Sequence, residues 1–495
     1  MEKIDNLKRQ RIEKLERIKE LGVNPYPTKF ERTGFVKDFK ADFKDKKNVK
    51  VAGRIVSLRK MGKAAFFNVK DFSGRMQVYI QREAVGEENF KLFKCLDIGD
   101  FIGVSGYLFL TKTAEKSIHA EEIKVLTKSL KALPIVKEKE TLTGEKIKYD
   151  EVSDIEFRYR QRYVDLNINE GSLEVFKKRS KIISFLRNYL LNVDFLEVET
   201  PVMQPLCGGA AAKPFETYHN ALSMPLFLRI APELYLKRIM VGGADRVFEI
   251  GRNFRNEGIS TKHNPEFTML ELYQAYADYY DMMDLTESLI TDCLKVINHG
   301  ETLLNYGEHE IDFSNWTRIK MEDLFVKYAG IDFSLINNLA GIKKEADRLG
   351  VKYEDDTTSQ KIYDHIFEEK IEHRLINPTI VYDFPKAWSP LAKENFHNPL
   401  IAERFEVFIA AREIGNAYSE LNNPLDQKLR MEEQAQAKEL GDDEACDVDY
   451  DYIRALEYGM APCGGLGIGV DRLVMLFTNS QSIRDVILFP HLKKE

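Results

Sequence analysis

The region from Val49 to about Thr127 is the part of the chain whose pattern most restricts the possible folds. Its residues form short runs in which apolar and polar side chains alternate, and glycines or turn sequences such as Asp-Phe-Ser-Gly separate the runs. A period of two is typical of half-buried β-strands. Five such strands in about eighty residues predict a small closed β-barrel, for which the OB-fold is the best candidate.

The rest of the chain predicts further domains, because 495 residues exceed what one hydrophobic core usually organises. Residues 2–21 have the pattern of an amphipathic helix that ends at Gly22. From Arg158 onward, helical patterns alternate with strands, which predicts an α+β domain around a mainly antiparallel sheet. The predicted boundaries are an N-terminal helix and lead-in at 1–47, an OB-fold barrel at 48–134, a linker at 135–157 and the α+β domain at 158–495, with a helical insertion at about 315–375.

Several features predict a cytoplasmic protein. No run of about 18 apolar residues occurs, so we expect no segment that spans a bilayer. The N-terminus lacks the apolar block of a signal peptide. The five cysteines are scattered, odd in number and without a C-x-x-C pair, which argues against a disulfide framework or a zinc site.

Positive charge is concentrated near the N-terminus, although the net formal charge of the chain is -7. Between Lys37 and Arg75 there are twelve Lys or Arg residues and four Asp or Glu residues, whereas residues 439–451 are strongly acidic. The lysine-rich segment has the electrostatics to bind a polyanion such as a nucleic acid. A merely solvated surface explains the same charge equally well.

One segment carries side chains suited to a nucleotide. Arg255 and Glu257 precede a polar loop, and His263 and Phe267 follow it. A strand, a loop and a second strand would bring these four side chains together over one sheet. An arginine can bind a phosphate and a carboxylate at once, which lysine cannot do in the same geometry, and Phe267 could stack on a purine. A Walker loop, G-x-x-x-x-G-K-[ST], does not occur in the chain.

Two other segments flank this one in sequence. FLEVETP at 195–201 reads as a strand closed by a proline, and Gly465-x-Gly467-x-Gly469 precedes Arg472 at the expected start of a helix. In this order the three segments resemble motifs 1, 2 and 3 of the class II aminoacyl-tRNA synthetases. The stretches RIAPELYLKRIMVGGADRVFEIGRNFRNEGIS, HNPEFTMLELYQAYADY and REIGNAYSELNNPLDQ narrow the resemblance to class II lysyl-tRNA synthetases.

The resemblance implies a fold, an activity and a set of partners. The fold would be an antiparallel sheet with flanking helices, preceded by an OB-fold domain that binds the tRNA anticodon. The activity would be ATP-dependent activation of lysine to lysyl-adenylate, followed by transfer to the terminal ribose of tRNA(Lys), with AMP and pyrophosphate released. More than one Mg²⁺ ion would assist, and the segment around Pro201 would form a homodimer interface.

The resemblance also implies roles for individual residues. Arg255 and Arg472 would act in catalysis, and the carboxylates of Glu406 and Glu413 would hold Mg²⁺. The implied ATP-binding residues are Arg255, Glu257, His263, Phe267, Glu406 and Arg472. The implied lysine-binding residues are Gly209, Glu233, Glu271, Tyr273, Asn416 and Glu420. The implied anticodon-binding residues are Phe66, Gln77, Arg59, His119 and Glu122, whereas Phe67 and Tyr79 are expected in the barrel core.

Three alternatives share part of this pattern. Lysyltransferases that act on an elongation factor resemble the α+β domain but lack the barrel. A degenerate RNA-binding relative would be expected to have lost one of the nucleotide-binding or metal-binding residues. Aspartyl and asparaginyl relatives share the architecture, but three carboxylates in one pocket are costly unless the ligand is a cation, which favours lysine.

Overall fold

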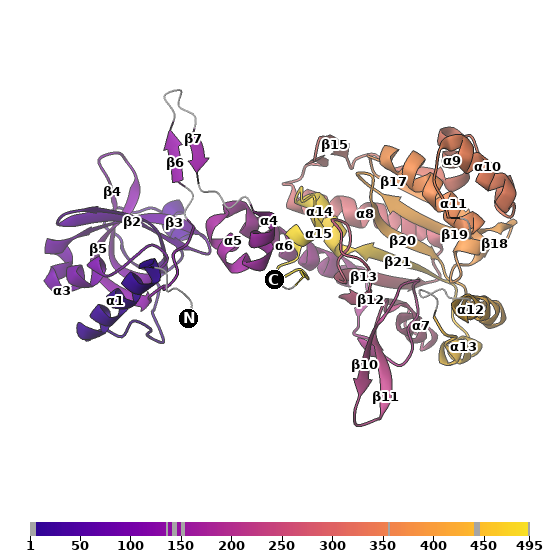
Figure 1. Ribbon diagram of the computed structural model, residues 1–495, viewed down its shortest axis with the longest axis horizontal. Helices are drawn as coiled ribbons and strands as arrows, with labels where there is room; N and C mark the ends of the chain where they lie inside the picture. Colours follow the sequence, from indigo (N-terminus) through magenta and orange to yellow (C-terminus); the bar gives the residue numbers. More distant parts are fainter. Residues whose placement is uncertain are drawn as a thin grey trace. The chain divides into compact units, whose positions relative to one another are not determined.

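The computed structural model describes residues 6–134, 137–140, 146–149, 154–354, 357–439 and 446–493. Contacts between residues divide the chain into two compact units, Met1–Asp154 and Ile155–Glu495. Figure 1 shows both units coloured along the sequence. Within the described ranges, no helix is long and apolar enough to cross a membrane.

The N-terminal unit is a closed five-stranded barrel, which confirms the predicted OB-fold. Around the barrel the strands follow in the order β1 (Asn48–Met61), β2 (Ala64–Asp71), β3 (Gly74–Gln81), β5 (Lys116–Thr127) and β4 (Phe101–Leu110). The helices of this unit are α1 (Asn6–Glu20), α2 (Val36–Ala41) and α3 (Arg82–Lys94).

Alternation along the strands sends apolar side chains into the barrel. Val51 and Ile55 of β1, Phe67 of β2 and Val78 of β3 are buried in one core cluster. Strand β1 pairs with both β2 and β4. Gly53 of β1 allows the backbones of β1 and β2 to lie close together. A Cβ atom on Gly53 would lie 2.5 Å from the backbone oxygen of Lys70.

The predicted linker contains a short hairpin that the sequence did not indicate. Strands β6 (Lys137–Glu140) and β7 (Lys146–Tyr149) pair antiparallel. Residues 135–136, 141–145 and 150–153 of the predicted linker lie outside the described residues.

The C-terminal unit is built on a large, mainly antiparallel sheet, as predicted. Only the pairs at its two ends, β12 with β8 and β16 with β17, are parallel. The sheet order is β16 (Thr317–Lys320), β17 (Thr379–Pro385), β19 (Asn398–Phe408), β20 (Glu413–Ser419), β21 (Cys463–Gly469), β13 (Glu266–Ala275), β12 (Arg246–Phe254) and β8 (Leu196–Glu197), with β18 (Glu394–Asn395) paired to β19.

One face of this sheet packs against helices. Apolar residues of α6 (Glu170–Asn192), α8 (Tyr279–Ile297) and α14 (Val470–Phe477) pack against the strands in the largest core cluster of the described residues. Leu270 and Leu272 of β13 belong to this cluster. Because neighbouring residues of a strand point to opposite faces, Glu271 and Tyr273 point to the other face.

The other face is covered only at its ends. At one end, Val247 and Tyr273 pack with α7 (Glu233–Val241) and α13 (Tyr450–Glu457). At the other end, Val381 and Phe408 pack with the helices that lie between β16 and β17. These helices are α9 (Met321–Ala329), η1 (Phe333–Leu335), α10 (Leu339–Leu349), α11 (Ser359–Ile366), η2 (Phe367–Ile371) and η3 (Glu372–Arg374). The central strands β13, β20 and β21 are left accessible between the two groups.

The segment predicted as a strand over 195–201 differs from the prediction. Only Leu196–Glu197 pairs with the sheet as β8. Beyond it, the Val198 N–H still donates to the Phe248 backbone oxygen of β12. The backbone N–H and the hydroxyl of Thr200 then donate to the side chain of Glu249 rather than to a backbone oxygen of β12. Pro201 has no N–H to continue the ladder, so the chain leaves the sheet here.

A small second sheet projects from the unit. Strands β10 (Phe215–His219) and β11 (Met224–Leu228) form a hairpin, and β9 (Met203–Gln204) pairs with β11. The remaining elements are α4 (Ile155–Arg160), α5 (Arg162–Ile168), α12 (Pro424–Glu439), α15 (Ile483–Val486), β14 (Leu303–Tyr306), β15 (His309–Asp312) and η4 (Lys386–Trp388).

Candidate active site

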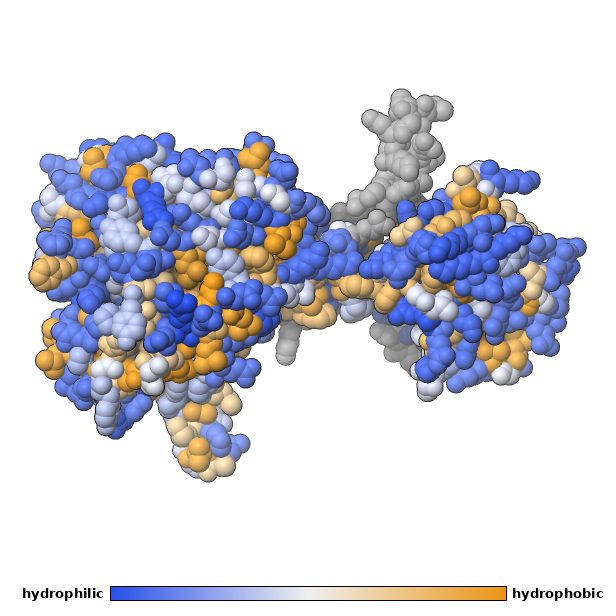
Figure 2. Space-filling view, turned by 180° about the vertical axis from the view of Figure 1, so that it is seen from behind, coloured by the Kyte–Doolittle hydropathy of each residue, from blue (hydrophilic) through white to orange (hydrophobic). Residues whose placement is uncertain are grey.

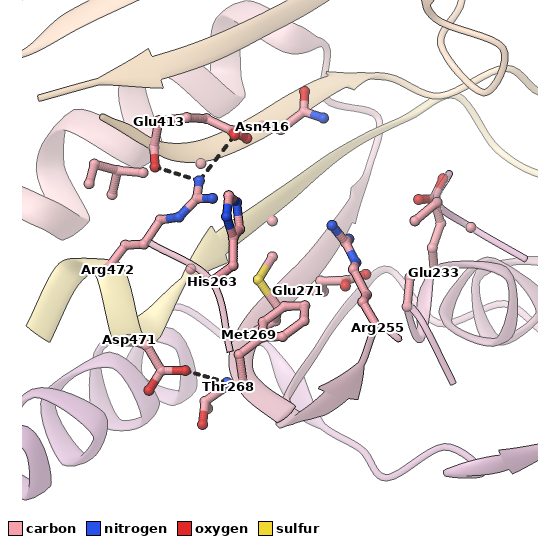
Figure 3. A pocket seen from close by; sticks show the side chains of 18 of the residues that line it. Glu233, Arg255, His263, Thr268, Met269, Glu271, Glu413, Asn416, Asp471 and Arg472 are labelled. Carbon is pink, nitrogen blue, oxygen red and sulfur yellow. Dashed lines mark hydrogen bonds and ion pairs between the residues drawn. The ribbon is translucent and has the colours of Figure 1, made fainter. Parts of the chain in front are cut away.

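A cavity of about 360 Å³ opens over the central strands of the large sheet. Figure 3 shows its labelled side chains spread from Arg472 and Glu413 on one side to Glu233 on the other. The predicted site residues that line it are Gly209, Glu233, Arg255, Glu257, His263, Phe267, Glu271, Tyr273, Glu413, Asn416, Glu420 and Arg472. Glu406 is not among its lining residues.

The glycines of β21 make room for the side chains of the neighbouring strands. Gly465 lies opposite Tyr273 on β13 and opposite Tyr418 on β20. A Cβ atom on Gly465 would lie 2.0 Å from Glu420 Oε1 and 2.6 Å from the Tyr273 ring. The glycine therefore allows Glu420 and Tyr273 to reach the cavity wall.

Two arginines line this cavity: Arg255 follows the end of β12, and Arg472 lies on α14. The guanidinium carbon of Arg255 is 5.2 Å from the centroid of the Phe267 ring. Its buried Nε has no hydrogen-bond partner among the described residues, so a donor is available for an anionic ligand. Arg472 Nη1 donates to the Glu413 backbone oxygen at 2.8 Å and to its carboxylate at 3.1 Å (Figure 3).

The start of α14 is tied to β13 by a buried carboxylate. Asp471 accepts a hydrogen bond of 2.6 Å from the backbone N–H of Thr268 and pairs with Arg179 of α6. This contact fixes Arg472 relative to Phe267 on β13. Nearby, His263 Nδ1 lies 3.2 Å from the Ser260 hydroxyl, and burial, with the positive charge of Arg472, lowers the pKa of His263.

The anionic end of the cavity holds Glu233, Glu271 and Glu420, all buried. Burial is the main cause that raises the pKa of Glu271 to about 8 and that of Glu420 to about 8, and Glu233 adds to both shifts. Glu420 Oε1 has no hydrogen-bond partner among the described residues. This end is therefore suited to a buried cation.

Sequence reasoning missed one residue of this end, Lys237. It lies one helical turn after Glu233 on α7, and its Nζ is 2.7 Å from Glu233 Oε1. The same ammonium also pairs with Glu420. Burial by itself would lower the pKa of Lys237, but the two carboxylates outweigh burial and raise it well above its ordinary value. The i, i+4 spacing with Glu233 was the signal that could have found it.

Glu406 and Glu413 lie on adjacent strands of the β19–β20 hairpin. Arg404 Nη2 donates to Glu406 at 2.6 Å. The pKa of Glu406 is raised to about 7, mainly by burial and further by Glu413 and Asp364, whereas Arg404 opposes the rise. Two neighbouring carboxylates thus oppose the ionisation of Glu406, and one arginine favours it. Among the described residues, no group of three or more His, Cys, Asp or Glu side chains could hold a metal ion by itself.

Two carboxylates nevertheless fit the way in which Mg²⁺ binds beside a nucleotide. Mg²⁺ usually takes one or two protein carboxylates, and phosphate oxygens and water complete its octahedral shell. The donor chemistry and the charge balance of Glu406 and Glu413 therefore suit Mg²⁺ bound together with a nucleotide.

In the N-terminal unit, a row of side chains crosses the outer face of the barrel. Strand pairing places Arg59 opposite Phe66, Phe66 opposite Tyr79, Tyr79 opposite His119 and His119 opposite Tyr107. Ring centroids are 4.8 Å apart for Phe66 and Tyr79, 5.4 Å for Tyr79 and His119, and 4.9 Å for His119 and Tyr107. We call these five residues the ring row.

The placement of Tyr79 corrects the prediction that it belongs to the barrel core. Tyr79 is half-buried on the outer face, whereas Phe67 is 1% exposed inside the barrel. Gln77 Nε2 donates to the Ser117 hydroxyl at 3.0 Å, and Glu122 is exposed beyond a bulge in β4–β5 pairing. The ring row offers flat side chains of the kind on which nucleic-acid bases stack.

Comparison with known proteins agrees with this geometry. The family model for class II tRNA synthetases (D, K and N) matches residues 154–493, and the model for the OB-fold nucleic acid binding domain matches residues 49–126. The chain therefore belongs to the class II tRNA synthetases.

Full-length relatives narrow this assignment. The lysine–tRNA ligase of Syntrophomonas wolfei is 50% identical over 99% of this chain and 97% of its own length. The lysine–tRNA ligase of Pelotomaculum thermopropionicum is 51% identical over 99% of this chain and 96% of its own length. The lysine–tRNA ligase of Carboxydothermus hydrogenoformans is 49% identical over 99% of both chains. Within the class, the chain belongs to the lysine–tRNA ligase family.

Proposed function

We propose that this enzyme activates L-lysine with ATP and transfers it to tRNA(Lys). One observation carries the choice of amino acid: three buried carboxylates, Glu233, Glu271 and Glu420, share one cavity with Arg255. A diamino acid presents two ammonium groups to the carboxylates and one carboxylate to the arginine.

In the first step, a lysine carboxylate oxygen attacks the α-phosphorus of ATP, and the bond to the bridging oxygen breaks, so that pyrophosphate leaves. Arg255 binds both the attacking carboxylate and the α-phosphate, which reduces the repulsion between two anions. Phe267 stacks on the adenine, and Arg472 holds the other side of the nucleotide. Glu257 contacts the adenine edge and His263 the phosphate tail.

The substrate amino acid lies at the anionic end. Glu233 and the backbone near Gly209 receive the α-ammonium group, Glu271, Tyr273 and Glu420 receive the ε-ammonium group, and Asn416 helps to hold the carboxylate. In the second step, the terminal ribose hydroxyl of tRNA attacks the adenylate carbonyl, and AMP leaves with the electrons of the carbonyl–phosphate bond.

Glu406 and Glu413 would hold Mg²⁺, which supplies positive charge to the phosphates when it is bound. The negative charge of Glu413 and Asp364 beside Glu406 supports this assignment. In the other unit, Arg59, Phe66 and His119 of the ring row, with Gln77 and Glu122 beside it, would contact the anticodon. An enzyme that loads tRNA for translation works in the cytoplasm, and we propose that location.

A homodimer accounts for exposed apolar side chains in one region of the C-terminal unit. These side chains lie in or next to β8, β9 and the β10–β11 hairpin. Figure 2 shows apolar surface along that projecting hairpin. The residues concerned are Leu196, Val202, Met203, Tyr218 and Leu222. Sedimentation of the purified protein tests this: a monomer at micromolar concentration would contradict it.

Amino-acid-dependent exchange of pyrophosphate into ATP tests the proposed activity. With Mg²⁺ present, we expect exchange with lysine and none with arginine, aspartate or asparagine. Exchange with aspartate or asparagine would overturn the choice of substrate. Charging of tRNA(Lys) by the same preparation tests the second step, and exchange without charging would favour an acceptor other than tRNA.

A further inference from the structure

Lys237 is a cation that belongs to the protein and lies at the anionic end of the cavity. Its side chain is 0% exposed, and its ammonium group contacts both Glu233 and Glu420. The same group lies 5.3 Å from the centroid of the Tyr418 ring and 6.0 Å from that of Tyr273. A lysine in this place has no access to solvent, so its charge acts only within the pocket.

The positive charge of Lys237 reduces the net negative charge that a substrate must balance at this end of the cavity. The pocket end contains the carboxylates of Glu233, Glu271 and Glu420 and the ammonium of Lys237, which leaves two net negative charges when all are ionised. The two ammonium groups of one lysine molecule balance these charges. Arg255, which lines the same cavity, is left to bind the substrate carboxylate. Since a buried charge without a partner is costly, this match favours a diamino acid.

Lys237 also orients the two carboxylates that receive opposite ends of the substrate. It contacts one oxygen of Glu233, and the Tyr418 hydroxyl donates to that same oxygen at 2.5 Å. It contacts Oε2 of Glu420, while Oε1 of Glu420 lies against Gly465 at the cavity wall. The carboxylates of Glu233 and Glu420 thus contact the same ammonium group, which sets the distance between the two carboxylates.

We propose that Lys237 is a positioning and specificity-determining residue for the substrate amino acid. It neutralises one of the three carboxylates and holds Glu233 and Glu420 at the spacing that accepts both ammonium groups of lysine. This inference rests on the proposed function, because it assumes lysine as the substrate. It predicts that Lys237 governs the selection of lysine over ornithine, whose side chain is one methylene shorter.

Lys237→Met tests the inference, because methionine fills similar space without a charge. In pyrophosphate exchange we expect the KM for lysine to rise at least about 100-fold, as when one partner of a buried charge pair is removed. The KM for ATP should change less than about threefold. The preference for lysine over ornithine in kcat/KM should fall at least tenfold.

Rescue of Lys237→Ala by methylammonium distinguishes a role of the Lys237 charge from a merely structural role. Methylammonium should enter the space left by the side chain and restore lysine-dependent exchange in Lys237→Ala but not in Lys237→Met, where the space is filled. Arg238→Gln is the matched control, since Arg238 is the next residue of α7 and pairs instead with Asp449 and Asp451. It should keep the lysine preference of the unaltered enzyme. Thermal unfolding of each variant shows whether it folds, and the rescue remains measurable in Lys237→Ala if Lys237→Met does not fold.

The outcomes separate this inference from the proposed function. An unaltered enzyme without lysine-dependent exchange would overturn the proposed function. An active unaltered enzyme whose Lys237 variants keep the KM for lysine and the preference over ornithine would overturn the role of Lys237 alone. Equal losses for lysine and ATP without rescue by methylammonium would also overturn it, because they would indicate general damage.

Discussion

At the scale of single residues, buried polar atoms without partners indicate where a ligand binds. The structure leaves Arg255 Nε, Asn253 Oδ1 and Glu420 Oε1 buried and without partners among the described residues, whereas Glu420 Oε2 pairs with Lys237. Such atoms are costly in a folded protein. Arg255 and Glu420 line the cavity, and Asn253 Nδ2 contacts Glu271 at 3.4 Å. A substrate with ammonium and carboxylate groups would supply partners for them.

The raised pKa values of Glu271 and Glu420, both about 8, predict that lysine binds more tightly as the pH rises. Below pH 8 these carboxyls hold protons, and a bound ammonium group must displace them. The Kd for lysine should therefore fall between pH 6 and 8, by up to roughly tenfold per pH unit for each proton released, and level off above 8. Titration calorimetry in buffers of different ionisation enthalpy counts the protons. A Kd that does not change from pH 6 to 8 would contradict this explanation.

Gly465→Ala should block the anionic end of the cavity. The added Cβ would lie 2.0 Å from Glu420 Oε1, so that Glu420 must move. We expect a rise of at least about 100-fold in the KM for lysine and a loss of roughly 1–3 kcal/mol in stability from overpacking. Gly171→Ala is the control, because a Cβ there meets no atom within 4 Å. Unchanged lysine kinetics in Gly465→Ala would refute the close approach.

At the scale of elements, the site depends on how β13, β21 and α14 are joined. Strand β13 supplies Phe267, Glu271 and Tyr273 on one face, while its other face packs in the main core. Helix α14 carries Arg472, and Asp471 anchors the start of that helix to β13. Asp471 therefore fixes Arg472 of α14 relative to Phe267 of β13, whereas Arg255 lies in the loop after β12.

Asp471→Asn should weaken this connection. The substitution keeps the shape but leaves Arg179 with a neutral partner in a largely buried position. We expect a loss of about 3 kcal/mol in the free energy of unfolding, as for a broken buried ion pair, together with a higher KM for ATP. Asp292→Asn, which alters only an exposed pair with Lys295, should cost less than about 0.5 kcal/mol. Urea titration and exchange kinetics measure both effects, and equal stability of the two variants would contradict the anchor.

At the scale of the whole molecule, we propose that the chemistry and the recognition of the anticodon belong to different units. Phe66→Ala removes a ring from the barrel surface and should raise the KM for tRNA by about tenfold or more, because stacking contributes ~1–3 kcal/mol per base. Pyrophosphate exchange, which needs no tRNA, should not change. The neighbouring Phe67→Ala should instead destabilise the barrel by about 3–5 kcal/mol, since Phe67 is in the core. Loss of exchange in Phe66→Ala would contradict the separation.

Much of the fold could be predicted from local patterns, and most of the candidate site was implied by the family resemblance. Alternation along 49–127 predicted the barrel, and the order of the segments around Pro201, Arg255 and Arg472 predicted the class II domain. The roles implied for Arg255 and Glu271 stay predictions, although both line the cavity. Tyr79 was wrongly expected in the core because it is aromatic, although it alternates along β3 with the buried Met76, Val78 and Ile80.

By itself, the sequence determined the family and the strand and helix periods, because these depend on residues close together or on a recognisable order; the three carboxylates of one pocket were implied only through the family resemblance. The tertiary structure decided which side chains meet. It brought Lys237 of α7 onto Glu420 of the loop after β20, and it placed Arg59 and Tyr107 in one row across the barrel. Sheet pairing and packing join positions that lie far apart along the chain, and local patterns do not specify the distances between such positions.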